Sequence, residues 1–102
     1  HQENWAYIQE NFRFLQHYLE TYLPQCRLIK PEATYLAWVD CSGLGFNGKE
    51  LEAFIKDKAK LWLDTGRIFG KESECFMRFV LACPRRTLAE ALDRLRKAVE
   101  GR

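Results

Sequence analysis

The strongest constraint on the fold is the apolar run CFMRFVLAC at residues 75–83. Aromatic and β-branched side chains fill much of it, which is typical of a β-strand covered on both faces. Side chains alternate along a strand, so Phe76 and Arg78 share one face, while Met77 and Phe79 share the other. We expect the Met77 face to pack on helices and the Arg78 face to point toward whatever covers the opposite side.

Arg78 is the exception within this run. A guanidinium stays charged at any accessible pH and is seldom fully buried without a partner. Held on a rigid strand, it suits a two-point grip on a carboxylate. It equally suits a solvent-facing position in which its stem covers apolar surface. The residues alone leave both interpretations open.

Three segments around the strands have helical features. In residues 2–23 the apolar side chains recur every three or four positions, which predicts an amphipathic helix. Asn47 followed by Glu50 is a variant of the capping box and predicts the start of a second helix. Thr87 with Glu90 predicts a capping box for a last helix.

The first helix carries two apolar stripes, and core packing is the expected use of both. A contact between the second stripe and a neighbouring domain is the alternative. The first stripe comprises Trp5, Ile8, Phe12, Leu15, Leu19 and Tyr22, and the second comprises Tyr7, Phe14 and Tyr18.

The remaining segments complete the predicted fold. Residues 27–30 and 35–40 predict a hairpin, residues 61–63 a very short strand, and residues 64–74 a loop. This order predicts an α+β fold, a two-layer sandwich with three helices packed on one side of a small, mostly antiparallel sheet. A chain of 102 residues fits a single domain at 1–102. Because it opens on His1 within a helical pattern, without an initiator Met, we interpret it as a piece of a longer protein.

Charge and cysteine content argue against several classes of protein. The chain has 16 Lys and Arg against 14 Asp and Glu, interspersed along the sequence, which argues against a nucleic-acid binder. Its four cysteines contain no C-x-x-C pair, so we expect no metal site. Free thiols at apolar positions favour a reducing, cytoplasmic location. No run approaches the ~20 apolar residues of a membrane span, so we expect no membrane partner.

Three motifs give the chain a family resemblance. KPEATYLAWVD at residues 30–40, GRIFG at 66–70 and FMRFVLACPR at 76–85 occur in this order. Their order and approximate spacing resemble the C-terminal small domain of class I/II aminotransferases, which are pyridoxal-phosphate enzymes of fold type I. The similarity is strongest to the cystathionine β-lyase-like C-S lyase branch, in which an arginine strand ending in Ala-Cys-Pro precedes the final helix. It extends over essentially the whole chain.

The resemblance implies a function that this chain shares with a larger protein. Arg78 would bind the α-carboxylate of an amino-acid substrate, and Ile68, Phe69 and Gly70 would belong to a loop at the active-site entrance. The lysine and phosphate-binding residues that hold pyridoxal 5'-phosphate would lie in a large domain that precedes this segment. The resemblance therefore implies a cofactor in the full-length homodimeric enzyme. It also implies that this fragment has no catalytic residue, no bound cofactor and no activity alone.

A second function stays open from the residues themselves. The chain could be a free-standing α+β module that binds a protein or a small ligand with an exposed sheet face, without catalysis. The sequence also leaves open the choice between transamination and β-elimination, and the substrate side chain, because residues outside the segment would make that choice.

Overall fold

The computed structural model describes residues 5–29, 35–60 and 74–102. These residues form three α-helices, three strands and a short 3-10 helix. In chain order the elements are α1 (Trp5–Tyr22), β1 (Arg27–Leu28), β2 (Leu36–Asp40), η1 (Ser42–Leu44), α2 (Gly48–Asp57), β3 (Phe76–Val80) and α3 (Arg85–Glu100). The strand expected at 61–63 and nearly all of the loop expected at 64–74 lie outside the described residues.

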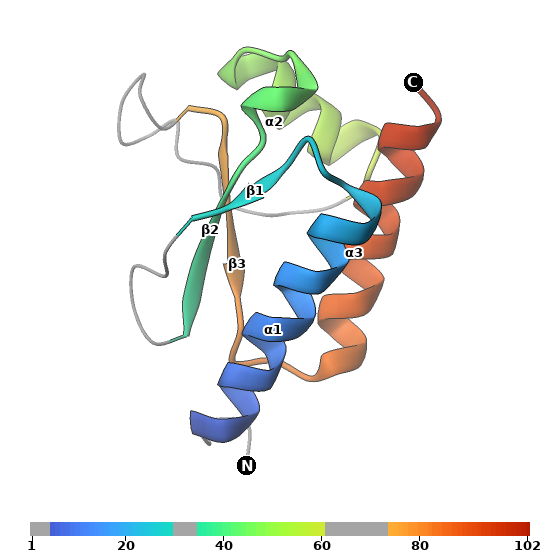
Figure 1. Ribbon diagram of the computed structural model, residues 1–102. Coiled ribbons are helices and arrows are strands. Elements are labelled where there is room, and N and C mark those ends of the chain that lie inside the picture. Colours follow the sequence, from blue (N-terminus) through green and yellow to red (C-terminus); the bar gives the residue numbers. More distant parts are fainter. Residues whose placement is uncertain (1–4, 30–34, 61–73) are drawn as a thin grey trace.

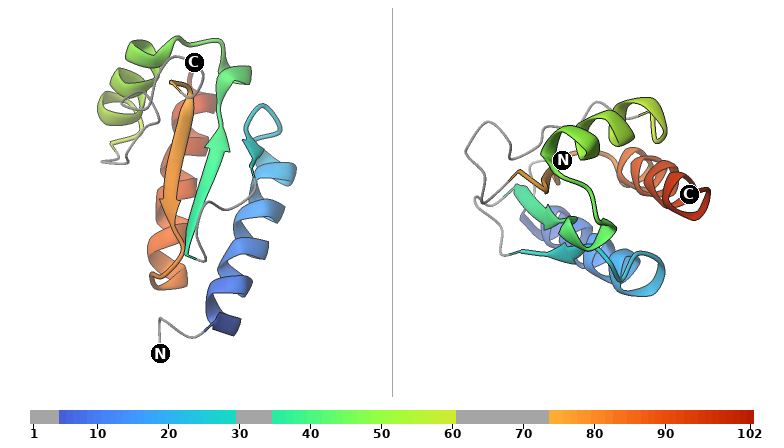
Figure 2. Two further views of the ribbon diagram at one scale, coloured as in Figure 1. Left: turned by 90° about the vertical axis from the view of Figure 1, so that its left-hand side faces the viewer. Right: turned by 90° about the horizontal axis from the view of Figure 1, so that it is seen from above.

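The strands form one antiparallel sheet in the order β1-β2-β3. Its register places Arg27 opposite Asp40 and Trp38 opposite Arg78. α1 and α3 lie side by side behind the sheet, and α2 lies toward the end where β2 finishes and β3 begins (Figures 1 and 2). The predicted hairpin and the predicted α+β architecture, with helices on one side of an antiparallel sheet, are both confirmed.

The core lies between the helices and one face of the sheet. The side chains of β2 and β3 that point toward the helices are at most 2% exposed. These are Ala37, Val39, Met77 and Phe79. They meet apolar side chains from the helices, among them Leu15, Leu19, Leu88, Leu92 and Leu95. The alternation predicted for the third strand is therefore confirmed on its helix-facing side.

The opposite face of β3 differs from the sequence-based expectation. In the described part of the molecule, Val80 is 47% exposed, and Phe76 and Arg78 are only partly buried. Within the described residues the helices pack against one face of β3 only, so these residues alone do not cover the strand on both faces. We call the sheet face that carries Trp38, Phe76, Arg78 and Val80 the open face.

The strand is also shorter than expected, since β3 ends at Val80. Asn11 of α1 is fully buried, and its side-chain amide donates to the carbonyl oxygens of Leu81 at 2.8 Å and Cys83 at 2.9 Å. These two carbonyls therefore bond to a helix side chain instead of to a strand. No pattern in the sequence predicts a buried polar residue in α1.

The apolar stripes of α1 are buried unevenly. Trp5 and Tyr22, at the two ends of the first stripe, are 53% and 44% exposed. Tyr18 of the second stripe is buried, and its hydroxyl donates a hydrogen bond to the Asp93 carboxylate of α3. Tyr7, also in the second stripe, accepts a 2.8 Å hydrogen bond from the backbone N–H of Arg85. The second stripe thus packs against α3, the use that the sequence favoured.

The two predicted capping boxes have different outcomes. At α2, the Asn47 side chain accepts from the Glu50 N–H, and the Glu50 carboxylate accepts from the Asn47 N–H, both at 2.9 Å. The box predicted for Thr87 is wrong, because α3 begins at Arg85 and Thr87 already lies in its first turn. The Pro84 carbonyl accepts the Thr87 N–H at 3.0 Å, and proline is favoured at helix starts.

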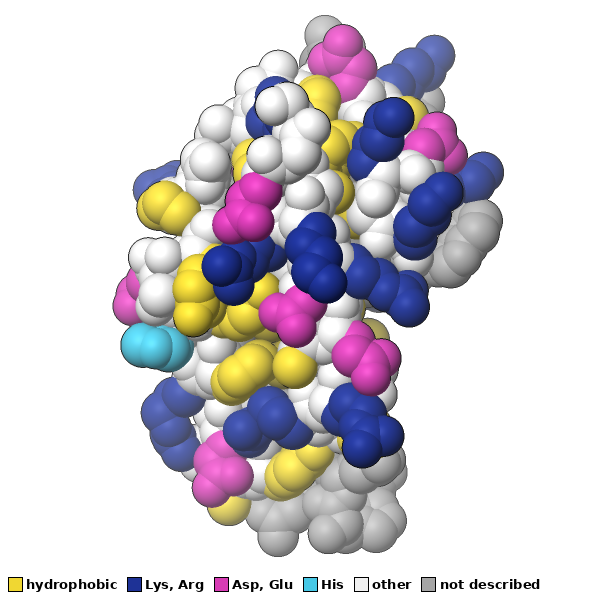
Figure 3. All heavy atoms as spheres, turned by 90° about the vertical axis from the view of Figure 1, so that its right-hand side faces the viewer, with side chains coloured by type: hydrophobic (Ala, Val, Ile, Leu, Met, Phe, Trp, Pro, Cys, Tyr) yellow, Lys and Arg dark blue, Asp and Glu magenta, His cyan; other side chains and the backbone are white. Residues whose placement is uncertain are grey.

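Charges on the helical side of the molecule are mixed in sign. Figure 3 shows basic and acidic side chains interspersed there, with apolar side chains between them. Within the described ranges, none of the helices combines the length and apolar character needed to cross a membrane. The same ranges contain no group of three or more His, Cys, Asp or Glu side chains that could hold a metal ion.

Candidate functional site on the open face of the sheet

Arg78 lies at the centre of β3 on the open face. It is partly buried, and Trp38 stands directly opposite it on β2. Trp38 is only 9% exposed although no helix covers this face in the described part of the chain. The backbones of β2 and β3 pair before and after these two residues, so the Arg78 guanidinium projects from a rigid strand.

Apolar side chains surround the Arg78 position. The Trp38 and Phe76 rings have centroids 6.4 Å apart and are tilted by 51°. On the other side of Arg78 along the strands, Val80 stands opposite Leu36. An apolar border lowers the local dielectric and strengthens the attraction between a fixed guanidinium and an anion. The arrangement can therefore hold a small carboxylate more tightly than an arginine in open solvent could.

Asp40, at the end of β2, is the acidic residue of the described open face. Its carboxylate lies 3.4 Å from the Arg27 guanidinium and accepts a 2.9 Å hydrogen bond from the Ser42 N–H. Burial raises the pKa of this carboxyl, but the hydrogen bonds from Ser42 and the charge of Arg27 outweigh burial and lower the pKa below its usual value. Asp40 is thus kept ionised by its own neighbours, at the end of the sheet.

The other predicted site residues are not placed. Ile68, Phe69 and Gly70 lie outside the described residues.

The lysines in the described ranges are all exposed and belong to α2, α3 or the residues just after α2. They are Lys49, Lys56, Lys58, Lys60 and Lys97. These residues therefore do not fit a pyridoxal-phosphate site beside Arg78, because none of them extends from the described sheet.

Trp38 is the site residue that sequence reasoning missed. Its alternation with Leu36 and Asp40 was readable in the sequence, but alternation does not say which residue of β3 faces it. That depends on the register between strands separated by 35 residues of chain, from Asp40 at the end of β2 to Phe76 at the start of β3. No feature of the sequence specifies which residue of β2 pairs with which residue of β3.

Known proteins are similar to this chain in both sequence and fold. The sequence is 36% identical to cystathionine β-lyase PatB of Bacillus subtilis over 92% of this chain and 24% of PatB. Cystalysin from Treponema denticola, whose crystal structure contains pyridoxal 5'-phosphate, has a TM-score of 0.87 and 34% identity over 94% of this chain and 24% of its own. A pyridoxal-phosphate-bound protein of Clostridium difficile, assigned as an aminotransferase, has a TM-score of 0.86 and 40% identity over 92% of this chain and 24% of its own.

No protein-family model matches the chain. The chain spans about a quarter of the length of the curated relatives it matches. Both the sequence alignment and the structural superpositions cover more than nine tenths of this chain. The homologues and structural neighbours of this segment are therefore pyridoxal-phosphate-dependent aminotransferases and cystathionine β-lyase-like C-S lyases.

Proposed function

We propose that this chain is the C-terminal small domain of a pyridoxal-phosphate-dependent aminotransferase or C-S lyase acting on amino acids. In this proposal Arg78 binds the α-carboxylate of the substrate. The observation that carries it is the position of Arg78, centred on the open face, opposite Trp38 and bordered by apolar side chains. The similarity to cystathionine β-lyase and to pyridoxal-phosphate-bound aminotransferases supports an amino-acid carboxylate as the anion for that guanidinium.

Arg78 would act by orientation. A planar guanidinium can grip both carboxylate oxygens at once, which fixes the direction of the substrate as well as its place. Trp38 and Phe76 would limit the access of water to this contact, so less of the attraction is lost to solvent. Holding the reacting bond in one direction contributes to catalysis because the cost of ordering the substrate is met on binding.

The rest of the site would come from outside this chain. Pyridoxal phosphate, bound by a large domain of the same polypeptide, would supply the electron sink for reactions at the α and β carbons. That domain would cover the open face, where Val80 is 47% exposed. Ile68, Phe69 and Gly70 would border the entrance, and two such polypeptides would form a cytoplasmic homodimer.

The experiment is a kinetic comparison in the full-length enzyme. Arg78→Ala removes a charged hydrogen-bonding partner, which costs about 2 to 4 kcal/mol of transition-state binding, or roughly 30- to 1,000-fold in kcat/KM. Both β-elimination from cystathionine and transamination of common amino acids are measured, so that either reaction of the family can report the loss. The cofactor absorbance of each preparation is recorded to show that the variant still binds pyridoxal phosphate.

Two further variants make the comparison specific. Arg78→Lys keeps the charge but loses the two-point grip, so its kcat/KM should fall between those of the wild type and Arg78→Ala. Arg96→Ala removes an arginine from α3, where it pairs with Glu100 at 3.0 Å, and should leave kcat/KM unchanged. A cofactor-loaded Arg78→Ala enzyme with wild-type kcat/KM would contradict the assignment of Arg78.

A further inference from the structure

Two cysteines face each other at the end of the sheet. The β1–β2 ladder ends where Arg27 pairs with Asp40. Extending this register by one residue places Cys26 opposite Cys41, and their side chains are in contact. Cross-strand neighbours in this relation direct their side chains to the same face, and here both thiols are buried, at 3% and 1% exposure.

The hydrogen-bond pattern gives the type of this pair. Antiparallel ladders alternate between hydrogen-bonded and non-hydrogen-bonded pairs. The Ile29 N–H donates to the Trp38 carbonyl at 2.9 Å, so the Cys26 and Cys41 positions, three steps away, fall on a non-hydrogen-bonded pair. The Cys41 N–H accordingly donates to the other side, to the Cys75 carbonyl at 2.9 Å. Non-hydrogen-bonded pairs have Cα atoms about 4.5 Å apart, within the ~4.4–6.8 Å that a disulfide spans.

The two turns that carry these cysteines also touch through their backbones. A Cβ atom added to Gly43 would lie 2.3 Å from the Gln25 carbonyl oxygen. Only glycine allows this approach, so the turn after α1 is held directly against the turn after β2. The positions of Cys26 and Cys41 are therefore fixed relative to each other.

The thiols of Cys26 and Cys41 interact with each other, and the Cys41 thiol also donates to the Val39 carbonyl at 3.8 Å. The hydrogen bond with Cys41 lowers the pKa of the Cys26 thiol against the opposing effect of burial, while the same contact and burial raise the pKa of Cys41. Cys75 donates to the Phe46 carbonyl at 3.2 Å, and Cys83 donates to the Val80 carbonyl at 3.2 Å. The contact between Cys26 and Cys41 therefore distinguishes this pair from Cys75 and Cys83.

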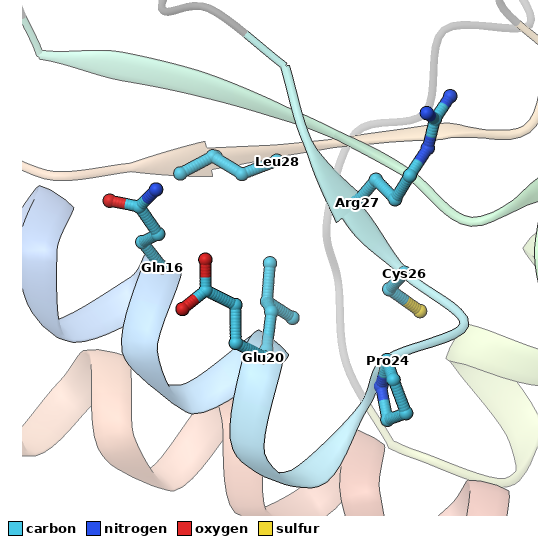
Figure 4. Close-up of a pocket in the computed structure, with 7 residues that line it drawn as sticks. Gln16, Glu20, Pro24, Cys26, Arg27 and Leu28 are labelled. Atoms are coloured by element: carbon cyan, nitrogen blue, oxygen red, sulfur yellow. The ribbon is translucent and has the colours of Figure 1, made fainter.

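Cys26 also borders a surface pocket of about 350 Å³. Gln16 and Glu20 of α1 line the same pocket, together with Pro24 and Leu28 (Figure 4). Cys26 lines this pocket and Cys41 does not, so a small polar molecule that enters the pocket meets Cys26 first. The order of attack follows from this geometry, with Cys26 first and Cys41 second.

We propose that Cys26 and Cys41 form a dithiol site that hydrogen peroxide converts into an intramolecular disulfide. The Cys26 sulfur attacks one peroxide oxygen, the O–O bond breaks, one water leaves, and Cys26 becomes a sulfenic acid. The Cys41 sulfur then attacks the Cys26 sulfur, the S–O bond breaks, and the S–S bond forms as a second water leaves with the thiol proton. Two thiols are oxidised by two electrons, and the peroxide is reduced to two waters.

The test maps thiols in the full-length protein after exposure to hydrogen peroxide. Free thiols are alkylated under denaturing conditions, and the protein is digested with trypsin, which cuts between Arg27 and Leu28 and so separates the two cysteines. Mass spectrometry should find a peptide pair linked through Cys26 and Cys41, released by reductant. Cys83 should stay alkylatable at the level of the untreated protein.

Matched variants distinguish this pair from its neighbour. Cys41 also faces Cys75 across the β2–β3 register, on a hydrogen-bonded pair with the wider Cα spacing. Cys75→Ser should therefore leave the Cys26–Cys41 linkage intact, while Cys26→Ser should abolish it. A Cys41–Cys75 linkage, or full alkylation of Cys26 and Cys41 after peroxide, would overturn the proposal. The wild-type map needs no variant to fold, and it does not depend on the role of Arg78.

Discussion

The two faces of the sheet differ in how far the described residues of this chain bury them. On the inner face, α1 and α3 bury Met77 and Phe79 almost completely. On the open face, residues one position away along the same strand, Phe76 and Val80, keep substantial contact with solvent in the described part of the molecule. Burial on the inner face accounts for folding, whereas the open face contains aromatic surface and a cation that folding of these residues does not require.

The largest expected effect contrasts two phenylalanines of β3. Phe79→Ala should lower the free energy of unfolding of this chain by about 3 to 5 kcal/mol, because it removes a fully buried ring and leaves a cavity. Phe76→Ala should cost about 1 to 2 kcal/mol, because part of that ring is already in water. Urea denaturation followed by tryptophan fluorescence measures both. Equal losses would mean that the two faces do not differ in the way described.

The next effect concerns the buried amide of the inner side. Asn11→Ala leaves the carbonyls of Leu81 and Cys83 without their side-chain donor, which should cost about 1 to 3 kcal/mol of unfolding free energy. Gln16→Ala, on the exposed side of the same helix, should change stability by no more than about 0.5 kcal/mol. Urea midpoints of the two variants, compared at equal slope, check the difference. An Asn11→Ala variant with the unfolding free energy of the wild type would show that water replaces the amide without cost.

The contact between α1 and α3 should add a pH dependence. Burial and the hydrogen bond to Asp93 raise the pKa of Tyr18 to about 12, above the ~10 of an exposed tyrosine. The raised folded-state pKa means that this stabilisation is complete below pH ~10 and is lost as the pH rises toward 12. Tyr18→Phe should cost about 1 kcal/mol at pH 8 and should flatten the stability curve between pH 10 and 12.

Unfolding free energies at several alkaline pH values measure the Tyr18 effect. Tyr35→Phe is the matched control, because that ring is 47% exposed and the hydroxyl is not part of the helix contact. Its stability curve should follow that of the wild type. A Tyr18→Phe curve that falls as steeply as the wild-type curve would assign the alkaline loss to other groups.

The smallest effect is expected on the open face. Val80→Ala should change the unfolding free energy of this chain by no more than about 0.5 kcal/mol, since the side chain is 47% exposed. In the full-length enzyme the same change should lower the temperature of inactivation measurably if a large domain covers Val80, as we propose. Equal sensitivity in the two settings would argue against such a cover.

Local patterns predicted much of this fold because local physics determines it. The alternation of β3 and the Asn47 capping box depend on residues within a few positions of each other, and both are confirmed. Asn11 escaped prediction because its partners are 70 and 72 residues away. The Arg78 position could be recognised from its motif, but its pairing with Trp38 required a register that only the assembled sheet provides.

The buried amide of α1 also has a consequence for the timing of folding. Asn11 reaches its acceptors only when residues near the far end of the chain are in place. Contacts of such high sequence separation slow folding, because a long loop must close before they form. During synthesis, α1 can form its own turns early, but it gains its permanent polar partners only after β3 has left the ribosome. We therefore expect α1 to complete its packing only after residues 81–83 have been synthesised.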